Sequence, residues 1–270
     1  MGGYVRRDPR TWRGWSGMRE NRIRKVWETG GVARNVFLGI PDSFAAEVMA
    51  SLDWDGVTID MQHGVIDYQV AVNMLQAISR YEAAPMIRVP WNDPAIIMKA
   101  LDAGAYGIIC PMVNNRDDAE RFIGACRYAP NGYRSTGPVR AVFYAGTDYH
   151  QHAEETILTF AMIETREGLD NLDEILAMPG LDAVYIGPSD LSVSLGGPPG
   201  GDQTWPEAME AIEVILAGAK RHGVKAAIHT VSAEYANLMI DKGFDLVTLS
   251  NDYRHMSAKA REMLAALKTG

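Results

Sequence analysis

Several apolar, β-branched runs in this sequence are followed by polar side chains whose types suggest metal-assisted chemistry. Glu164 and Asp190 each come at the end of such a stretch, "FAMIE" and "AVYIGPSD". If the two carboxylates meet, they repel each other unless a cation lies between them. A small set of hard oxygen ligands suits Mg²⁺ or Mn²⁺, with substrate oxygens and water completing the coordination. Two carboxylates held in separate salt bridges are the alternative.

Arg88 and His63 supply two further groups that such a reaction needs. Arg88 ends the run "PMIR", and His63 lies three residues after Asp60, the carboxylate that ends "GVTID". A guanidinium beside a metal can hold a developing oxyanion, and a histidine can move a proton near neutral pH. With a cation, these groups could turn a 2-oxo acid into its enolate. His63 could instead be a structural histidine.

Two more sets of polar groups follow later runs. In "GPSD", Pro188 would fix a turn after Gly187, and the backbone amides of Ser189 and Asp190 could hold a small carboxylate. His229 lies near the end of the run "KAAIHT". It could face the same site, or it could be a histidine bonded to a neighbouring loop.

These side chains can cooperate only if the runs are neighbouring strands of one sheet. Short apolar runs alternate with stretches of helical periodicity, which implies parallel strands joined by crossover helices. Eight such units without a dominant glycine-rich phosphate loop favour an α/β fold of the closed (β/α)8 barrel type, in which the ends of all strands meet at one mouth. The predicted strands are Val36–Ile40, Gly56–Asp60, Pro85–Val89, Tyr106–Pro111, Thr159–Glu164, Ala183–Gly187, Lys225–Thr230 and Phe244–Ser250. The predicted helices cover about 42–51, 68–80, 93–103, 116–127, 167–177, 205–222, 232–242 and 253–268.

Two connections between these elements are long, 128–158 and 194–206. Loops of this length are usually functional or are structured by a partner subunit. The second is rich in glycine and proline, so it could be a lid over the mouth or a plain surface turn.

Composition limits the classes of protein that fit. The chain has 270 residues, of which 47% are hydrophobic and 22% charged, as in a globular protein with a large core. A net charge of −8 argues against a nucleic-acid partner, and no apolar run reaches the roughly 18 residues that span a membrane. Cys110 and Cys126 lack metal or redox spacing, which favours a reducing, cytoplasmic setting.

The beginning of the chain differs in charge from the rest. Residues 1–25 hold eight arginines and lysines against Asp8 and Glu20, a local charge of +6 that leaves −14 for the remainder. We therefore predict a basic arm over residues 1–30 and a barrel domain over 31–270. With Trp12 and Trp15, this arm could dock on a neighbouring subunit or on an acidic face of its own domain. A targeting role is less favoured, because acidic residues interrupt the arm.

Six motifs, in order and in register from about residue 35 to 265, resemble the HpcH/HpaI aldolases, a family of metal-dependent (class II) pyruvate aldolases. They are "IDMQHG", "IRVPWNDP", "LDAGAYGIICPMVN", "RYAPNGYRS", "IETREGLDNLDEIL" and "IGPSDLSVSLG". The resemblance implies a barrel of the phosphoenolpyruvate/pyruvate superfamily type with a divalent ion. It also implies a homohexamer, a trimer of dimers that swap the last helix. The implied lyase reaction is reversible cleavage of a 4-hydroxy-2-oxo acid to pyruvate and an aldehyde.

The resemblance also implies roles for individual residues. Glu164 and Asp190 match the metal ligands, Arg88 matches the arginine that binds pyruvate, and His63 matches the catalytic histidine. Asp60 matches the acidic residue before that histidine, and Asp102 matches a carboxylate that supports the histidine, within the subunit or across a subunit interface. Gly187 and Ser189 match positions that contact the pyruvate carboxylate, and Phe37 stands where members often carry tryptophan near the pocket.

Three positions depart from the family pattern. Gln62 stands where glutamate is common, and Met162 stands two residues before the metal-binding glutamate, where glutamine is common. His229, at an often apolar position, points to a polar or acidic aldehyde. Four other functions remain open: an oxaloacetate decarboxylase, a carbon–carbon bond-forming synthase, a less favoured CoA-thioester lyase, and a non-catalytic barrel that binds a 2-oxo acid.

Overall fold

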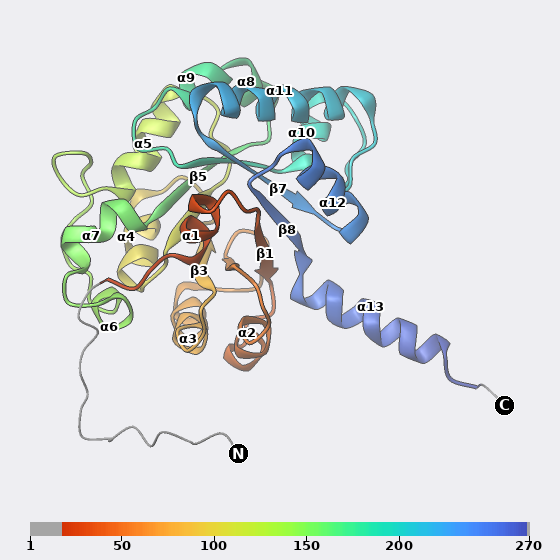
Figure 1. The fold of residues 1–270 in the computed structure, drawn as a ribbon, viewed down its shortest axis with the longest axis horizontal. Coiled ribbons are helices and arrows are strands. Elements are labelled where there is room, and N and C mark those ends of the chain that lie inside the picture. Colours follow the sequence, from red (N-terminus) through yellow and green to blue (C-terminus); the bar gives the residue numbers. More distant parts are fainter. Residues whose placement is uncertain (1–17, 269–270) are drawn as a thin grey trace.

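The computed structural model, which describes residues 18–268, is a closed barrel of eight parallel strands in chain order (Figure 1). The strand β1 pairs with both β2 and β8, and this pairing closes the sheet. The predicted (β/α)8 barrel is therefore confirmed, and each of the eight predicted strands is present. The strands are β1 (Ala33–Leu38), β2 (Gly56–Asp60), β3 (Ala84–Arg88), β4 (Gly107–Cys110), β5 (Leu158–Ile163), β6 (Ala183–Ile186), β7 (Lys225–Thr230) and β8 (Leu246–Asn251).

Helices surround the barrel, and most lie where the periodicity predicts them. These are α2 (Ser43–Ala50), α3 (Tyr68–Ile78), α4 (Pro94–Asp102), α5 (Arg116–Cys126), α11 (Pro206–His222), α12 (Ala233–Lys242) and α13 (Asp252–Ala265). The prediction of one helix over 167–177 is wrong, because α8 (Arg166–Asp170) ends at Asn171 and α9 (Leu172–Leu176) begins there. Four short helices were not predicted: α1 (Arg22–Glu28), α6 (Ala141–Ala145), α7 (Tyr149–Thr156) and α10 (Pro188–Leu195).

Polar residues that follow the strands explain why the helices begin at the mouth of the barrel. Asp42, Asp67, Asp93, Asn115 and Asn251 each precede a helix, and each side chain accepts a hydrogen bond from a backbone N–H of the first turn. Such N-caps satisfy amides that have no partner within the helix. The chain therefore turns sharply from strand to helix, and the polar groups of these turns gather at one end of the barrel.

The opposite end of the barrel is closed by α1. Ile23 and Trp27 are buried and join the cluster of apolar side chains inside the barrel, where Trp27 packs against Phe160. Arg22 pairs with Asp53 and Asp55, which belong to the same barrel. The described part of the basic arm thus docks on acidic residues of its own domain. Trp12, Trp15 and the other residues of 1–17 lie outside the described residues, and the domain boundary at residue 30 stays a prediction.

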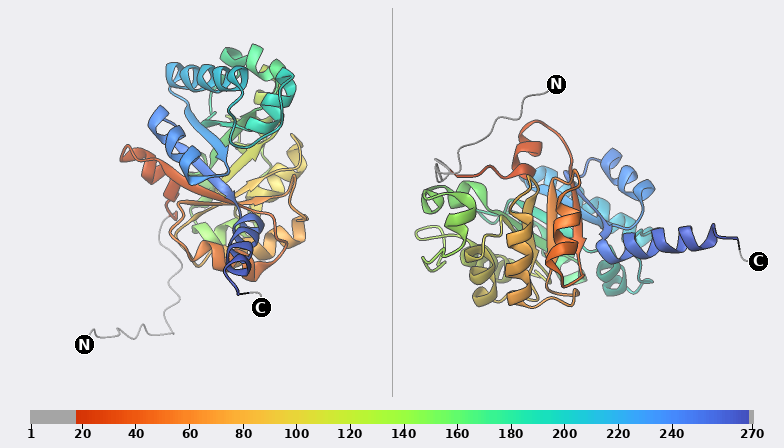
Figure 2. Two further views of the ribbon diagram at one scale, coloured as in Figure 1. Left: turned by 90° about the vertical axis from the view of Figure 1, so that its right-hand side faces the viewer. Right: turned by 90° about the horizontal axis from the view of Figure 1, so that it is seen from below.

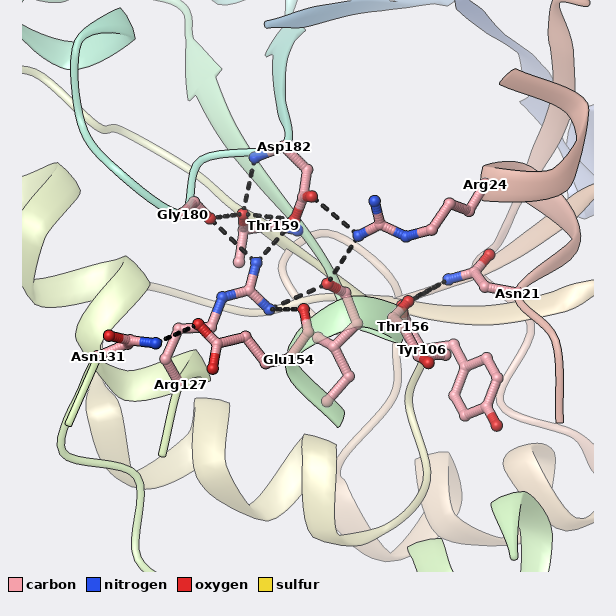
Figure 3. Close-up of polar contacts among 11 residues, drawn as sticks. Asn21, Arg24, Tyr106, Arg127, Asn131, Glu154, Thr156, Thr159, Gly180 and Asp182 are labelled. Carbon is pink, nitrogen blue, oxygen red and sulfur yellow. Dashed lines mark hydrogen bonds and ion pairs between the residues drawn. The ribbon is translucent and has the colours of Figure 1, made fainter. Parts of the chain in front are cut away.

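One carboxylate organises a buried polar network beside α1 (Figure 3). Asp182 accepts hydrogen bonds from Arg127 Nη2 at 2.8 Å, from Arg24 Nη2 at 2.9 Å and from the backbone N–H of Thr159 at 2.9 Å. The guanidinium of Arg127 is buried and also donates to the carbonyls of Ile157 and Gly180. A buried charge needs such partners, because water cannot reach it. The network joins α1, the end of α5 and the starts of β5 and β6.

The last helix, α13, projects from the barrel in Figure 1 and in the right view of Figure 2. Of its residues, only Asp252 is buried, whereas Met256 is 63% exposed and Leu264 67% exposed. An apolar side chain in water leaves hydrophobic free energy unrealised, and these side chains of α13 have little cover within the described residues. In residues 18–268, no helix is both long enough and apolar enough to cross a membrane.

We predict that Asp182→Ala lowers the free energy of unfolding by about 3 kcal/mol, because it leaves the buried Arg127 guanidinium without its counter-charge. Urea denaturation followed by circular dichroism measures the change. Asp173→Ala is the matched control, since Asp173 pairs with Arg221 and His222 on the exposed surface and should matter little. Equal effects of the two substitutions would contradict this account.

Candidate active site

A cavity of about 510 Å³ opens where the strands end, at the mouth of the barrel. Its volume lies within the range of small-molecule sites. All the site residues predicted from the sequence except Asp102 line this cavity. They are Phe37, Asp60, His63, Arg88, Glu164, Gly187, Ser189, Asp190 and His229.

Glu164 and Asp190 lie close enough for their charges to interact. Glu164 directly follows β5 and is only 3% exposed, and Asp190 lies in the first turn of α10. Burial, and to a smaller degree the charge of Asp190, raise the pKa of Glu164 to about 7, although an N–H donor from Met112 and the charge of Arg88 oppose this. A divalent cation between the two carboxylates would favour their ionised forms. Their oxygen donors fit Mg²⁺ or Mn²⁺.

The two carboxylates would bind the ion without a third protein ligand of the usual kinds. Residues 18–268 contain no group of three or more His, Cys, Asp or Glu side chains that lie close enough together to bind a metal ion. An octahedral ion held by two carboxylates keeps positions for water and for two substrate oxygens. This donor set suits an ion that binds together with a substrate.

Met112 contributes a contact that the sequence analysis missed. Its backbone N–H donates to Glu164 Oε1 at 2.9 Å, and its φ of 56° is in the left-handed region, which a side chain such as methionine rarely adopts. Strained backbone of this kind often marks a functional site. Its position directly after the predicted fourth strand could have indicated that Met112 lies near the mouth. The strained φ, by contrast, is set by the tertiary structure.

Gly187 and the start of α10 form the wall beside Glu164. A Cβ added at Gly187 would lie 2.5 Å from Glu164 Oε2, so a larger residue at this position would have to displace that carboxylate oxygen. Pro188 is the first residue of α10, not part of an isolated turn as predicted. The amides of Ser189 and Asp190 therefore lie in the first turn of a helix, where a carboxylate is bound favourably.

Arg88 and Asp60 form a buried two-pronged ion pair between β3 and β2. Arg88 Nε and Nη2 donate to the two oxygens of Asp60 at 2.8 and 2.6 Å. Asp60 Oδ1 also accepts from the backbone N–H groups of Gln62 and His63. Burial alone would raise the pKa of Asp60, but the bonds from Arg88 and these amides hold it below its usual value. Asp60 thus fixes both the guanidinium and the turn that carries His63.

His63 and Gln62 differ in their surroundings on that turn. The His63 side chain is exposed and lines the cavity, and its ring makes no hydrogen bond within the described part of the chain. The Gln62 side-chain oxygen is buried and likewise has no partner among the described residues. The imidazole is therefore accessible to a substrate, whereas Gln62 points into the protein.

Asp102 does not reach the cavity within this chain. It is the last residue of α4, and each barrel helix runs back from the mouth toward the opposite end. Its carboxylate binds Arg134 Nη2 at 2.7 Å, and burial raises its pKa although Arg134 opposes this. Asp102 therefore does not line the cavity together with His63 in this chain, and its support of His63 stays a prediction.

His229 lies in an aromatic and basic part of the cavity. Its ring packs edge-on against Phe37 at 5.2 Å, and its Nδ1 lies 3.4 Å from the hydroxyl of Tyr185. Burial lowers its pKa to about 4, helped by the positive charges of Arg88 and Arg254, so the ring is neutral near pH 7. The sequence analysis missed Tyr185 and Arg254 as cavity residues. Tyr185 sits inside a predicted strand, whereas nothing in the sequence signals that Arg254 of α13 reaches the mouth.

We predict that Gly187→Ala weakens Mn²⁺ binding at least about tenfold, since the new methyl group displaces Glu164 Oε2. Titration of metal-free protein with Mn²⁺, followed by electron paramagnetic resonance, measures the affinity. Gly137→Ala serves as the control, because a Cβ there meets no atom within 4 Å. Unchanged affinity in Gly187→Ala would argue against Glu164 as a ligand.

Comparison with known proteins agrees with this geometry. Residues 35–257 match the family HpcH/HpaI aldolase/citrate lyase. A hydroxypyruvate/pyruvate aldolase from Rhizorhabdus wittichii is 44% identical over 245 residues, which cover 91% of this chain and 98% of that protein. A 4-hydroxy-2-oxo-heptane-1,7-dioate aldolase from Escherichia coli is 34% identical over 250 residues, covering 92% of this chain and 94% of that protein.

A crystal structure of a HpcH/HpaI aldolase/citrate lyase family protein from Burkholderia cenocepacia J2315 has the same architecture. Its TM-score is 0.84 at 29% identity, and the match covers 91% of this chain and 98% of that one. The family match and the two aldolase relatives span almost the whole barrel. The chain therefore belongs to the HpcH/HpaI aldolase/citrate lyase family.

Proposed function

We propose that this protein is a divalent-metal-dependent aldolase that reversibly cleaves a 4-hydroxy-2-oxo acid to pyruvate and an aldehyde. The observation that carries the proposal is that four groups line one cavity at the barrel mouth: the buried carboxylate of Glu164, the exposed carboxylate of Asp190, Arg88 and the accessible His63. The names of the two relatives, both aldolases, support it.

Glu164 and Asp190 would hold Mg²⁺ or Mn²⁺. When bound, the ion supplies a Lewis acid that polarises the 2-oxo group and stabilises negative charge on its oxygen. The amides at the start of α10 orient the substrate by binding its carboxylate, next to Gly187 and Ser189. The substrate carboxylate would thus lie at the start of α10, with the oxo group directed toward Arg88.

Arg88 stabilises the enolate oxygen that forms when the carbon–carbon bond breaks. Its Nε and Nη2 are engaged by Asp60, whereas Nη1 has no protein partner in residues 18–268 and is available to a substrate. Because Asp60 already fixes the guanidinium, little reorganisation is needed as charge develops. The guanidinium carbon of Arg88 also lies over the Phe37 ring, 4.8 Å from the ring centre.

His63 moves the proton in this proposal. In the cleavage direction it accepts the proton of the 4-hydroxyl group, directly or through water, as the bond between C3 and C4 breaks. C3 of the enolate then takes up a proton, and this converts the enolate to pyruvate. An exposed ring on a turn fixed by Asp60 suits this task, because it is positioned and can still exchange protons with solvent.

We expect the protein to catalyse exchange of the pyruvate methyl protons in heavy water, and this exchange to need a divalent ion. Proton NMR with Mg²⁺, with Mn²⁺ and with a chelator measures it. Asp190→Asn should abolish the exchange while leaving the circular dichroism spectrum unchanged, because an amide is a poor ligand for these ions. His63→Ala should slow exchange about 100-fold with little change in pyruvate binding.

An aldehyde panel then separates the aldolase from the other enolate reactions. Reversible formation of a 4-hydroxy-2-oxo acid from pyruvate and an aldehyde supports the proposal. If the protein releases carbon dioxide from oxaloacetate but catalyses no aldol addition, it is a decarboxylase and not an aldolase. Absence of metal-dependent exchange would contradict all enolate chemistry at this site.

We also propose that the protein assembles as a homohexamer, a trimer of dimers that exchange α13, and that it works in the cytoplasm. The projecting helix supports the exchange, because its apolar side chains Met256, Met263 and Leu264 lack cover within the described chain, as does Leu267 just after it. Cys110 and Cys126 are buried free thiols, which agrees with a reducing compartment.

Native mass spectrometry is expected to give six times the mass of one chain. Leu264→Glu should shift the distribution to smaller species, because it places a charge in the buried contact that the exchanged helix would make. Lys259→Glu, on the same helix but already charged, is the control. A monomeric wild-type protein would contradict the assembly.

A further inference from the structure

The cavity has a half that the proposed pyruvate site leaves unused. Pyruvate would be held by groups at the ends of β3, β5 and β6. The remaining wall comes from the β7 end, the start of α13 and the loop between α10 and α11, where the lining residues are His229, Val231, Arg254 and Pro199–Gly201. This part of the cavity, between the loop and the end of β7, is the space left for the aldehyde, the second product of cleavage.

The loop, residues 196–205, has a defined shape of its own. The Gln203 side chain is only 4% exposed, and its amide donates to the carbonyls of Pro198 and Gly200 at 3.0 and 3.1 Å. The Ser192 hydroxyl of α10 donates to the carbonyl of Pro198 at 2.7 Å. These bonds fold the loop on itself and tie its beginning to α10. They do not fix it against the opposite wall of the cavity.

Asp202 makes that second attachment. Its Oδ1 accepts from the backbone N–H of Val231 at 2.7 Å, and its Oδ2 accepts from the N–H of Ser232 at 2.9 Å. Both bonds are charge-assisted and short, and Ser232 caps the start of α12, where a negative charge is favourable. Gly201 packs so closely on Val231 that an added Cβ would lie 2.5 Å from its side chain. The loop therefore meets the chain directly after β7, two residues beyond His229.

We propose that Asp202 is a positioning residue for the aldehyde half of the reaction. It fixes Pro199–Gly201 against the end of β7, and so sets the wall that faces the aldehyde beside His229. It does not touch the groups that would hold pyruvate and the ion. This inference rests on the proposed aldolase function, and it separates the two half-reactions: loss of Asp202 impairs aldehyde capture and leaves enolate formation intact.

Two measurements on the full-length, metal-loaded enzyme test this assignment. The first is metal-dependent exchange of pyruvate methyl protons, and the second is aldol addition of pyruvate to propanal at varied propanal concentration. Asp202→Ala loses both hydrogen bonds, and Asp202→Asn keeps one acceptor oxygen. In both variants we expect the rate of pyruvate proton exchange to stay within about twofold of the wild-type rate. The KM for propanal should rise about tenfold in Asp202→Ala and less in Asp202→Asn.

Asp93→Ala is the matched control. Asp93 also accepts a hydrogen bond from a backbone N–H, that of Ala95 at 2.9 Å, but it does not line the cavity. The substitution Asp93→Ala should lower the melting temperature without changing the KM for propanal. An unchanged KM in both Asp202 variants, or equal losses in exchange and addition, would overturn the assignment. Absence of exchange in the wild-type enzyme would instead overturn the aldolase function on which it rests.

Discussion

The ion pair between Asp60 and Arg88 is the contact on which the candidate site depends. It joins the ends of two neighbouring strands, β2 and β3, and both groups are largely buried, so neither charge is stable without the other. The same carboxylate binds the backbone of the turn that carries His63. One side chain therefore positions the group that would stabilise negative charge and the group that would move the proton. The barrel holds this pair by keeping the two strands in register.

The two ends of the barrel use charge in opposite ways. At the closed end, Asp182 is bound by Arg127 and Arg24, which compensates its charge. At the mouth, Glu164 and Asp190 repel each other, and Met112 and Ser250 have left-handed backbone conformations. Such unfavourable features persist only where the surrounding structure enforces them. The closed end thus stabilises the fold, whereas the mouth retains backbone strain and a repulsion between carboxylates that a cation would relieve.

The sequence was sufficient for most of the fold and for many of the cavity residues. All eight strands were predicted because their β-branched runs are short and separated by long amphipathic stretches. The short helices α6, α7 and α10 were missed, since a helix of one or two turns is stabilised mainly by packing and not by its own sequence. The break at Asn171 was missed for a similar reason: its side chain binds the carbonyl of Asn114, a contact between distant parts of the chain.

The sequence by itself determined which kinds of groups follow each strand and, through the eightfold alternation, that these groups meet at one mouth. Only the tertiary structure decided which of them touch. It paired Arg88 with Asp60, placed Asp102 at the far end of α4, brought the Met112 amide to Glu164 and joined Asp202 to the backbone that follows β7. The physical reason is that strand and helix patterns depend on residues near one another in the chain. Distances between distant residues depend instead on how the closed sheet and its helices pack as a whole.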